Sequence, residues 1–223
     1  FVADGASVKR LHRRIVLSRS YRQAAQGNAL AHERDPEATL LSRFPRRRLE
    51  AEAIRDSMLF VAGRLDRTRG GTLLPTNNRD YVTNDQSGNA ARYDAPRRTL
   101  YLPIIRNALH DMLGLFDYGD PSMPNDARSR TAVATQALWL MNSPVVGETA
   151  LAFARRLLRE EPLDTRARLD RAHRLALARP ATEAEIDRAA AWLARAEAAA
   201  AATNAASSGG DGAASPQERA LAL

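Results

Sequence analysis

The sequence predicts a mainly α protein: a multi-helix globular domain with at most one short strand or hairpin and a long irregular loop. Three observations support this fold class. Apolar residues recur at helical spacing over most of the chain, with capping signals at several helix starts. Only one short run is rich in β-forming residues, and residues 66–97 carry no periodicity but many Gly, Pro and Asn residues.

The composition is that of a globular protein. Of 223 residues, 44% are hydrophobic and 26% charged, which argues against global disorder. No apolar run approaches the roughly 18 residues that a membrane helix needs, so we expect no membrane-spanning segment. The sequence contains no cysteine, which excludes disulfides, thiolate metal sites and cysteine nucleophiles.

The chain is basic and rich in arginine. It has 33 basic and 26 acidic residues, a net charge of +7, and Lys9 is its only lysine. Residues 1–56 hold 12 basic and 7 acidic side chains, so +5 of the excess lies there. This concentration is compatible with a solvated helical face or with an acidic partner.

The first predicted helix covers residues 7–23. Ser7 is a suitable N-cap, and Val8, Leu11 and Ile15 share one face while basic side chains occupy the other. Residues 24–45 are predicted to be a connecting segment.

The second predicted helix covers residues 46–65. At 100° per residue, Glu50 falls within its apolar arc, while Arg55 and Asp56 lie on the opposite, polar side. We therefore expect Glu50 to face inward, either in a structural ion pair, for instance with Arg64, or as a carboxyl group of raised pKa at a functional site. Arg64 is accordingly a candidate binding residue.

The centre of the chain is less regular. Residues 66–97 form the long loop, of a length that is usually functional or flexible. Residues 99–102 are the best strand candidate, and a helix is predicted from Pro103 to Phe116. That helix contains Arg106, a second candidate binding residue.

Two aspartates follow in a turn-rich segment. Asp117 and Asp120 are candidates for catalytic carboxylates or for ligands of a divalent cation, although a hard cation wants more oxygens than two residues provide. The alternative is helix termination with local hydrogen bonds from the two side chains.

Residues 131–142 are almost free of charge and predict a central buried helix. Gln136 and Asn142 would then need internal partners. Both either hold neighbouring backbone or contact a substrate, so they complete the set of candidate binding residues.

The C-terminal third predicts three further helices, at 143–160, 164–178 and from 182 onward. Thr182 and Glu185 form a capping box at the last of these. We expect a main domain over 1–142, a helical subdomain over 143–203 and a flexible Ala/Ser/Gly linker over 204–223. The predicted core residues are Leu11, Ile15, Leu49, Ile54, Val61, Ile105, Leu109, Leu113, Leu138, Leu140, Leu157, Leu177 and Leu193.

Several ordered stretches carry a family resemblance. They are Ser7-Val8-Lys9-Arg10-Leu11-His12, Ser18-Arg19-Ser20-Tyr21-Arg22-Gln23, Arg46 through Asp56, Gly63-Arg64-Leu65-Asp66, Tyr101-Leu102-Pro103 with Arg106, Met112-Leu113 with Phe116-Asp117 and Asp120-Pro121-Ser122, Thr135-Gln136-Ala137-Leu138, and Asn142-Ser143-Pro144. Over residues 1 to about 195, the chain resembles the uncharacterised C-terminal domain of planctomycete surface or periplasmic proteins that carry an N-terminal cytochrome-c-like domain. The Tyr118-Gly119 pair and the loop at 72–97 depart from that pattern.

The resemblance implies an exported, multidomain parent protein in the periplasm or cell envelope. Haem would belong to an upstream domain only, because this chain has no Cys-x-x-Cys-His motif, and we expect no cofactor here. A start at Phe1 agrees with a segment of a longer protein, whose upstream domains are then the expected partners.

Three functions stay open at this point. The first is a structural or interaction module of the larger protein. The second is a carbohydrate-active hydrolase or lyase that acts on a polysaccharide with paired carboxylates, which requires Glu50 and Asp117 or Asp120 to converge within about 5–10 Å. The third is nucleic-acid binding through the basic first helix, although a recognition motif is missing.

Overall fold

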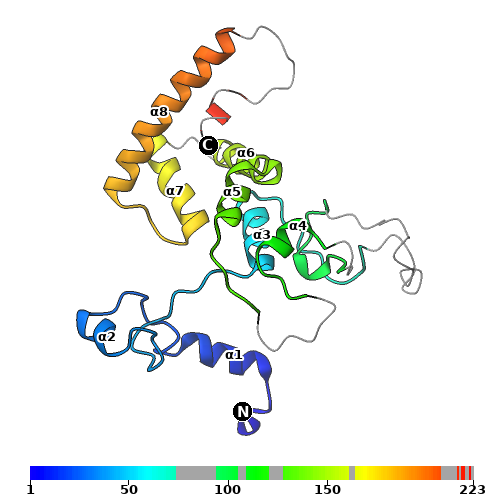
Figure 1. Cartoon of the computed structure of the whole chain (residues 1–223), viewed down its shortest axis with the longest axis vertical. Coiled ribbons are helices and arrows are strands. Elements are labelled where there is room, and N and C mark those ends of the chain that lie inside the picture. Colours follow the sequence, from blue (N-terminus) through cyan, green and yellow to red (C-terminus); the bar gives the residue numbers. More distant parts are fainter. Residues whose placement is uncertain are drawn as a thin grey trace. The chain divides into compact units, whose positions relative to one another are not determined.

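The computed structural model describes residues 1–73, 94–104, 109–120, 128–160, 164–206, 215, 217–218 and 221 (Figure 1). These residues form eight α-helices and two short 3₁₀ helices, and their only β feature is an isolated bridge between Asp66 and Arg97. The predicted mainly α fold class is confirmed. The chain forms two compact units, residues 1–48 and residues 49–223. The predicted boundary at residue 142 stays a prediction.

The first unit contains a 3₁₀ turn, η1 (Val2–Asp4), and two helices, α1 (Val8–Leu17) and α2 (Ala29–Arg34). Ser7 caps α1 as expected, because its hydroxyl accepts a hydrogen bond from the Arg10 amide. The predicted extension to residue 23 is wrong, since the backbone turns extended at Ser18. Helix α2 interrupts the predicted connecting segment, and Asn28 caps it.

The second unit begins with α3 (Ala51–Val61). This helix starts five residues later than predicted, because Glu50 has extended backbone angles (φ −69°, ψ 155°) and serves as the N-cap residue. Gly63, with φ 73°, follows its C-terminal end in the left-handed conformation that suits glycine.

The predicted strand at 99–102 is wrong. These residues form a 3₁₀ turn, η2 (Thr99–Tyr101), closed by hydrogen bonds from the Tyr101 amide to the Arg98 carbonyl and from the Leu102 amide to the Thr99 carbonyl. The predicted helix from Pro103 is reduced to α4 (Asp111–Leu115) in the described residues. Residues 105–108 lie outside them.

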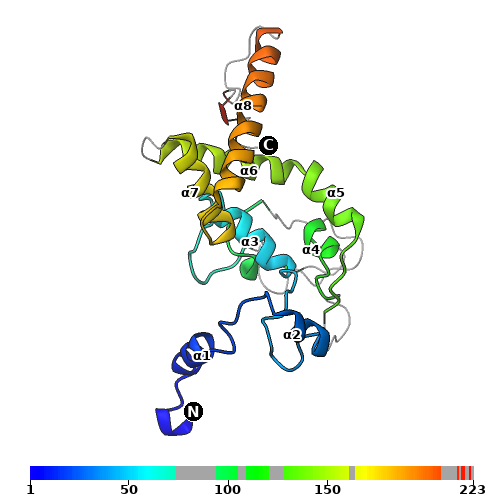
Figure 2. The ribbon, with the colours of Figure 1, turned by 90° about the vertical axis from the view of Figure 1, so that its left-hand side faces the viewer.

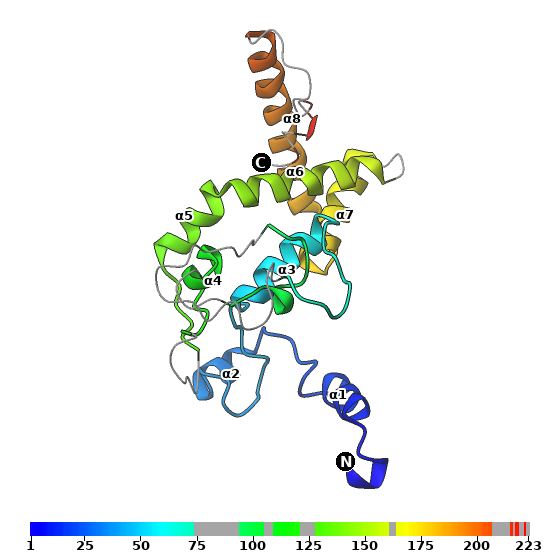
Figure 3. The ribbon, with the colours of Figure 1, turned by 90° about the vertical axis from the view of Figure 1, so that its right-hand side faces the viewer.

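The helices of the C-terminal third begin at the predicted residues, although the Ser143 side chain makes no capping hydrogen bond. Helices α5 (Ala134–Asn142) and α6 (Pro144–Arg159) are separated only by Ser143, and Figures 2 and 3 show them following one another along one path. Helix α7 (Thr165–Leu177) is capped by Asp164, whose carboxylate accepts a hydrogen bond from the Ala167 amide. Helix α8 (Glu183–Ala206) extends three residues into the predicted linker, most of which lies outside the described residues.

The predicted capping box of α8 is confirmed. The Glu185 amide donates to the Thr182 hydroxyl, and the Thr182 amide donates to the Glu185 carboxylate. A fork of Arg179 also binds that carboxylate, and these hydrogen bonds together hold the pKa of Glu185 far below its ordinary value.

Among the described residues, the apolar core lies in the second unit. One cluster joins α3 to α4, and further buried apolar residues lie on α6, α7 and α8, where α7 packs against both α6 and α8. The buried apolar residues of these elements are Ala51, Met112, Leu113, Phe116, Ala154, Leu157, Leu169, Ile186 and Leu193. The Phe116 and Trp139 rings meet edge to face at 5.8 Å, which brings α5 onto the first cluster.

The core predictions succeed in part. Leu113, Leu157 and Leu193 are buried, and Ile54 and Leu109 pack against the first cluster. The predictions that failed are Leu11, Ile15, Leu49, Leu138, Leu140 and Leu177, which are all exposed. Helical spacing identifies a shared face, but burial also requires a neighbouring surface, and within the described part of the chain these residues remain exposed. For the same reason α5 is not the central buried helix expected.

Candidate functional site

Helix α1 presents an uncovered apolar face. Val8, Leu11 and Ile15 are 57%, 38% and 46% exposed, and no residue of α1 is buried. Lys9 and Arg14 border this face and Arg10 and Arg13 lie on the opposite side, and the helix contains no acidic residue. An amphipathic helix of this kind normally lays its apolar side on another surface.

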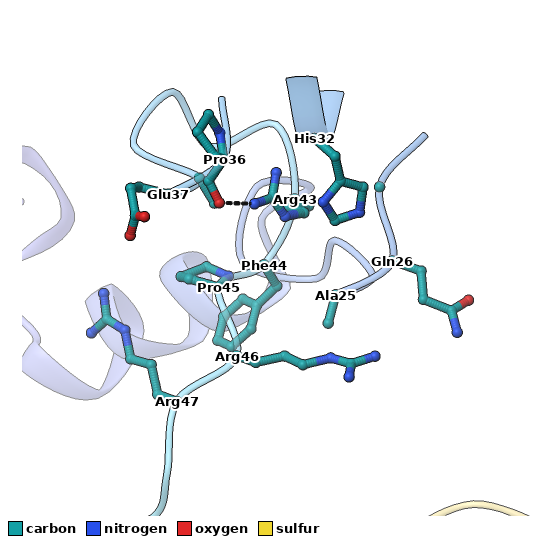
Figure 4. A pocket seen from close by; sticks show the side chains of 12 residues that line it. Ala25, Gln26, His32, Pro36, Glu37, Arg43, Phe44, Pro45, Arg46 and Arg47 are labelled. Atoms are coloured by element: carbon teal, nitrogen blue, oxygen red, sulfur yellow. Dashed lines mark hydrogen bonds between the residues drawn. The ribbon is translucent and has the colours of Figure 1, made fainter. Parts of the chain in front are cut away.

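A pocket of about 830 Å³ lies in the same unit, lined by segments 25–27, 36–38 and 43–47 together with His32. Its lining carries three guanidinium groups, from Arg43, Arg46 and Arg47, and one carboxylate, from Glu37 (Figure 4). The lining therefore carries a surplus of positive charge.

A buried polar pair shapes this pocket. The Asp35 carboxylate accepts four hydrogen bonds, from the amides of Thr39 and Leu40 and the hydroxyls of Thr39 and Ser42. Burial would raise the pKa of Asp35, but these hydrogen bonds outweigh burial and lower it. The loop after α2 is therefore held by a carboxylate rather than by apolar packing.

Arg43 is the second member of the pair. Its guanidinium donates to the backbone carbonyls of Ala31, Asp35 and Pro36, and only 8% of the residue is exposed. Sequence reasoning missed both residues, because neither belongs to a periodic segment. The one signal available was Asn28, whose capping side chain marks the start of α2.

Glu50 is not an inward-facing carboxylate. As the N-cap residue of α3, it lies outside the helical projection that placed it in the apolar arc, and its side chain is 58% exposed. Arg128 lies 3.8 Å from it and makes a closer pair with Glu52 at 2.7 Å. The expectation that Glu50 lies in an apolar site is therefore wrong.

Two other predicted site residues come together through Thr131. The Asp117 carboxylate accepts hydrogen bonds from the Thr131 amide at 2.7 Å and from its hydroxyl. The Gln136 amide group donates to the same hydroxyl and to the Leu115 carbonyl. Gln136 is buried, and these two hydrogen bonds are the internal partners that a buried amide group needs. The contacts join the end of α4 to the start of α5.

The remaining candidates are dispersed. Asp120 is exposed, and Asn142 donates to the Leu138 carbonyl one turn earlier in its own helix. Arg106 lies outside the described residues. No group of three or more His, Asp or Glu side chains suited to a metal ion occurs in the part of the chain that the structure describes.

Arg64 lies on a second pocket, of about 800 Å³, between the end of α3 and α6. Arg156 fixes this junction by donating to the carbonyls of Phe60 and Val61. Arg64 itself is exposed at the rim. Glu148 and Glu160 balance part of the positive charge of the other arginines there. The charge of this lining is therefore more balanced than that of the first pocket.

A buried arginine on α3 is the main structural residue that the projection misplaced. Arg55 lies on the supposedly polar side, yet it is only 7% exposed. It donates to the carbonyls of Ala95 and Arg97 and to the Thr99 hydroxyl, while Asp56 accepts from the Thr99 amide. Burial lowers the pKa of Arg55, and the neighbouring Asp56 opposes that shift.

The base of the long loop is closed by the same region. The Asp66 amide donates to the Pro96 carbonyl, and Arg97 donates to the carbonyls of Thr68 and Gly70. The Arg97 guanidinium also stacks 4.3 Å from the centre of the Tyr101 ring. The two ends of the 66–97 segment are thus tied together.

Comparison with known proteins finds one family. The family model described as PSD1, protein of unknown function (DUF1553), matches residues 1–193. No curated protein matches the chain, and no solved structure does. None of the described helices has the length and apolar character needed to cross a bilayer.

Proposed function

The chain belongs to the PSD1 family of proteins of unknown function, and we propose that it is a structural and interaction module of a larger exported protein. The single observation that carries this proposal is the uncovered apolar face of α1. Export and the multidomain setting rest on the family resemblance.

The argument starts from the stability of a short helix. Isolated helices shorter than about 12–15 residues are marginal in water, and α1 has 10 residues. Complete burial of an aliphatic side chain contributes about 1.5–3 kcal/mol. Val8, Leu11 and Ile15 make no such contribution while exposed, so α1 gains most of its stability when another surface covers it.

The charge of α1 indicates the chemistry of that surface. Basic side chains border the apolar face on both sides, at Lys9 and Arg14. An apolar groove rimmed with Asp and Glu carboxylates would complement both the apolar centre and the basic border. In this proposal an upstream domain of the parent protein provides the groove.

Hydrogen exchange of the longer parent protein tests the proposal. We expect α1 amides to be protected in the parent and to exchange rapidly in the 223-residue chain. Ile15→Asp in the parent should weaken docking about ten- to hundredfold, since it removes one buried aliphatic side chain. The α1 amides should then lose protection.

Leu17→Asp is the matched control. Leu17 belongs to the same helix and is 54% exposed, but it projects from the basic side. Equal loss of protection in both variants, or rapid exchange of α1 in the unmodified parent, would contradict the docking proposal. Salt-sensitive duplex DNA binding that survives Ile15→Asp would favour the nucleic-acid alternative instead.

A further inference from the structure

We propose that the basic pocket of residues 25–47 binds an extended acidic peptide. This inference is independent of α1 docking, because it concerns a different surface of the first unit.

The pocket has a fixed floor. Arg43 spans three carbonyl groups, and Asp35 holds the loop on which two of them lie. Gly27 packs closely against this floor, because a Cβ atom there would lie 3.1 Å from Cδ of Arg43. A preformed cavity reduces the entropy that a ligand must overcome on binding.

Arg46 and Arg47 provide the groups for recognition. Both are exposed, and neither makes a hydrogen bond or an ion pair within the described residues. Figure 4 shows them extending to opposite sides of Phe44 and Pro45. Two guanidinium groups that point apart cannot close on a single small anion, but they suit a ligand with carboxylates at two separated positions.

Phe44 and Pro45 lie between the two arginines and give the ligand an apolar contact. The Phe44 ring is held by an edge-to-face contact with Tyr21 at 5.8 Å, and the Phe44 amide donates to the Ala24 carbonyl. An apolar residue flanked by acidic residues on both sides would match this arrangement.

Glu37 argues for a peptide over a uniformly charged polysaccharide. It lies on the Arg47 side of the pocket in Figure 4. A polyuronate carries a negative charge on every sugar and would place one near this carboxylate. A peptide can place a neutral residue there, so the pocket favours mixed acidic and apolar sequence.

The test uses the full chain and a fluorescein-labelled peptide, Gly-Glu-Glu-Leu-Glu-Glu-Gly, followed by fluorescence anisotropy at low salt. We expect saturable binding that weakens as salt rises and that disappears when every Glu of the peptide is replaced by Gln. R46E/R47E should raise the Kd about tenfold or more, and R46Q/R47Q should weaken binding to a smaller extent.

R67E/R69E is the matched control. It makes the same change in net charge at two exposed arginines of the second unit, and it should leave the Kd within twofold. An equal loss in this control would show non-specific attraction and overturn the proposal. Absence of peptide binding to the unmodified chain, or displacement of the peptide by a tighter hexagalacturonate, would overturn it as well.

Discussion

The interiors of the two units of this chain differ in chemistry: one is apolar and the other is polar. In the second unit, Met112 and Leu113 are completely buried and the core is apolar. Among the first-unit residues whose burial is described, Ala38 is the only buried apolar one, and Asp35 and Arg43 are the buried polar ones. The first unit places its large apolar side chains on its surface instead.

This difference assigns the two units different tasks. Buried apolar area provides most of the net stability of a domain, so the second unit has its own source of stability. Hydrogen bonds give directional order but a modest net contribution, about 0.5–1.5 kcal/mol each. The described contacts of the first unit therefore give it directional order but little buried apolar area, and in our proposal a surface that covers α1 adds the missing stabilisation.

The largest effect is expected from a cavity in the apolar core of the second unit. Leu113→Ala should lower the free energy of unfolding of the second unit by about 2–5 kcal/mol, because it leaves a cavity in a fully buried site. Chemical denaturation followed by circular dichroism measures this change. Leu100→Ala, at a 74% exposed leucine of the same unit, should change the free energy by less than about 0.5 kcal/mol.

The next effect concerns the polar side. Asp35→Ala leaves the amides of Thr39 and Leu40 without their acceptor, which should cost about 1–3 kcal/mol locally. Hydrogen exchange should show a loss of amide protection at residues 29–44, while α6 to α8 keep theirs. Glu33→Ala removes an exposed carboxylate of α2 and should leave both regions unchanged. Global unfolding on loss of Asp35 would show that the units are not energetically separate.

The smallest effect is a dependence on pH. His110 caps α4 through Nδ1, which accepts a hydrogen bond from the Met112 amide. Burial, together with the charge of Arg55, lowers the pKa of His110. The folded state therefore disfavours protonation of His110. The contribution of neutral His110 to the stability of the fold is complete above about pH 6.5, and it declines as the pH falls toward the lowered pKa.

Melts between pH 7.5 and pH 5 would reveal this decline as a fall in the unfolding midpoint. His110→Asn keeps an N-capping oxygen that does not titrate and should remove this part of the pH dependence. An unchanged slope in that variant would assign the effect to other groups. The Asp35 loop should hold through the same range, because its pKa is lowered from 3.8.

The sequence was most informative where local chemistry determines structure. Asp164 and the Thr182–Glu185 box mark helix starts that the structure confirms, because a cap depends on a few adjacent residues. Leu113 and Leu193 were recognised as core from helical spacing. Membership of the PSD1 family also agrees with the resemblance read from ordered motifs.

Long-range contacts account for most of the failures. Burial of Arg55 depends on carbonyls about 40 residues away, which no local pattern reveals. Glu50 was misplaced because α3 begins only at Ala51, so Glu50 is the N-cap residue and a helical projection does not apply to it. The pocket of the first unit depends on Asp35 and Arg43, whose contacts lie within an irregular loop. The binding roles of Arg64, Arg106, Gln136 and Asn142, and a divalent cation at Asp117 and Asp120, stay predictions.

The tied ends of the 66–97 segment have a consequence for how this family can vary. Arg97 binds the carbonyls of residues 68 and 70, and Arg55 binds those of residues 95 and 97, so we expect residues inserted within the segment to leave these anchoring contacts in place. The entropic cost of a closed loop grows only slowly, by about 0.6 kcal/mol for each doubling of its length. We therefore expect insertions to be tolerated better within this segment than within the helices.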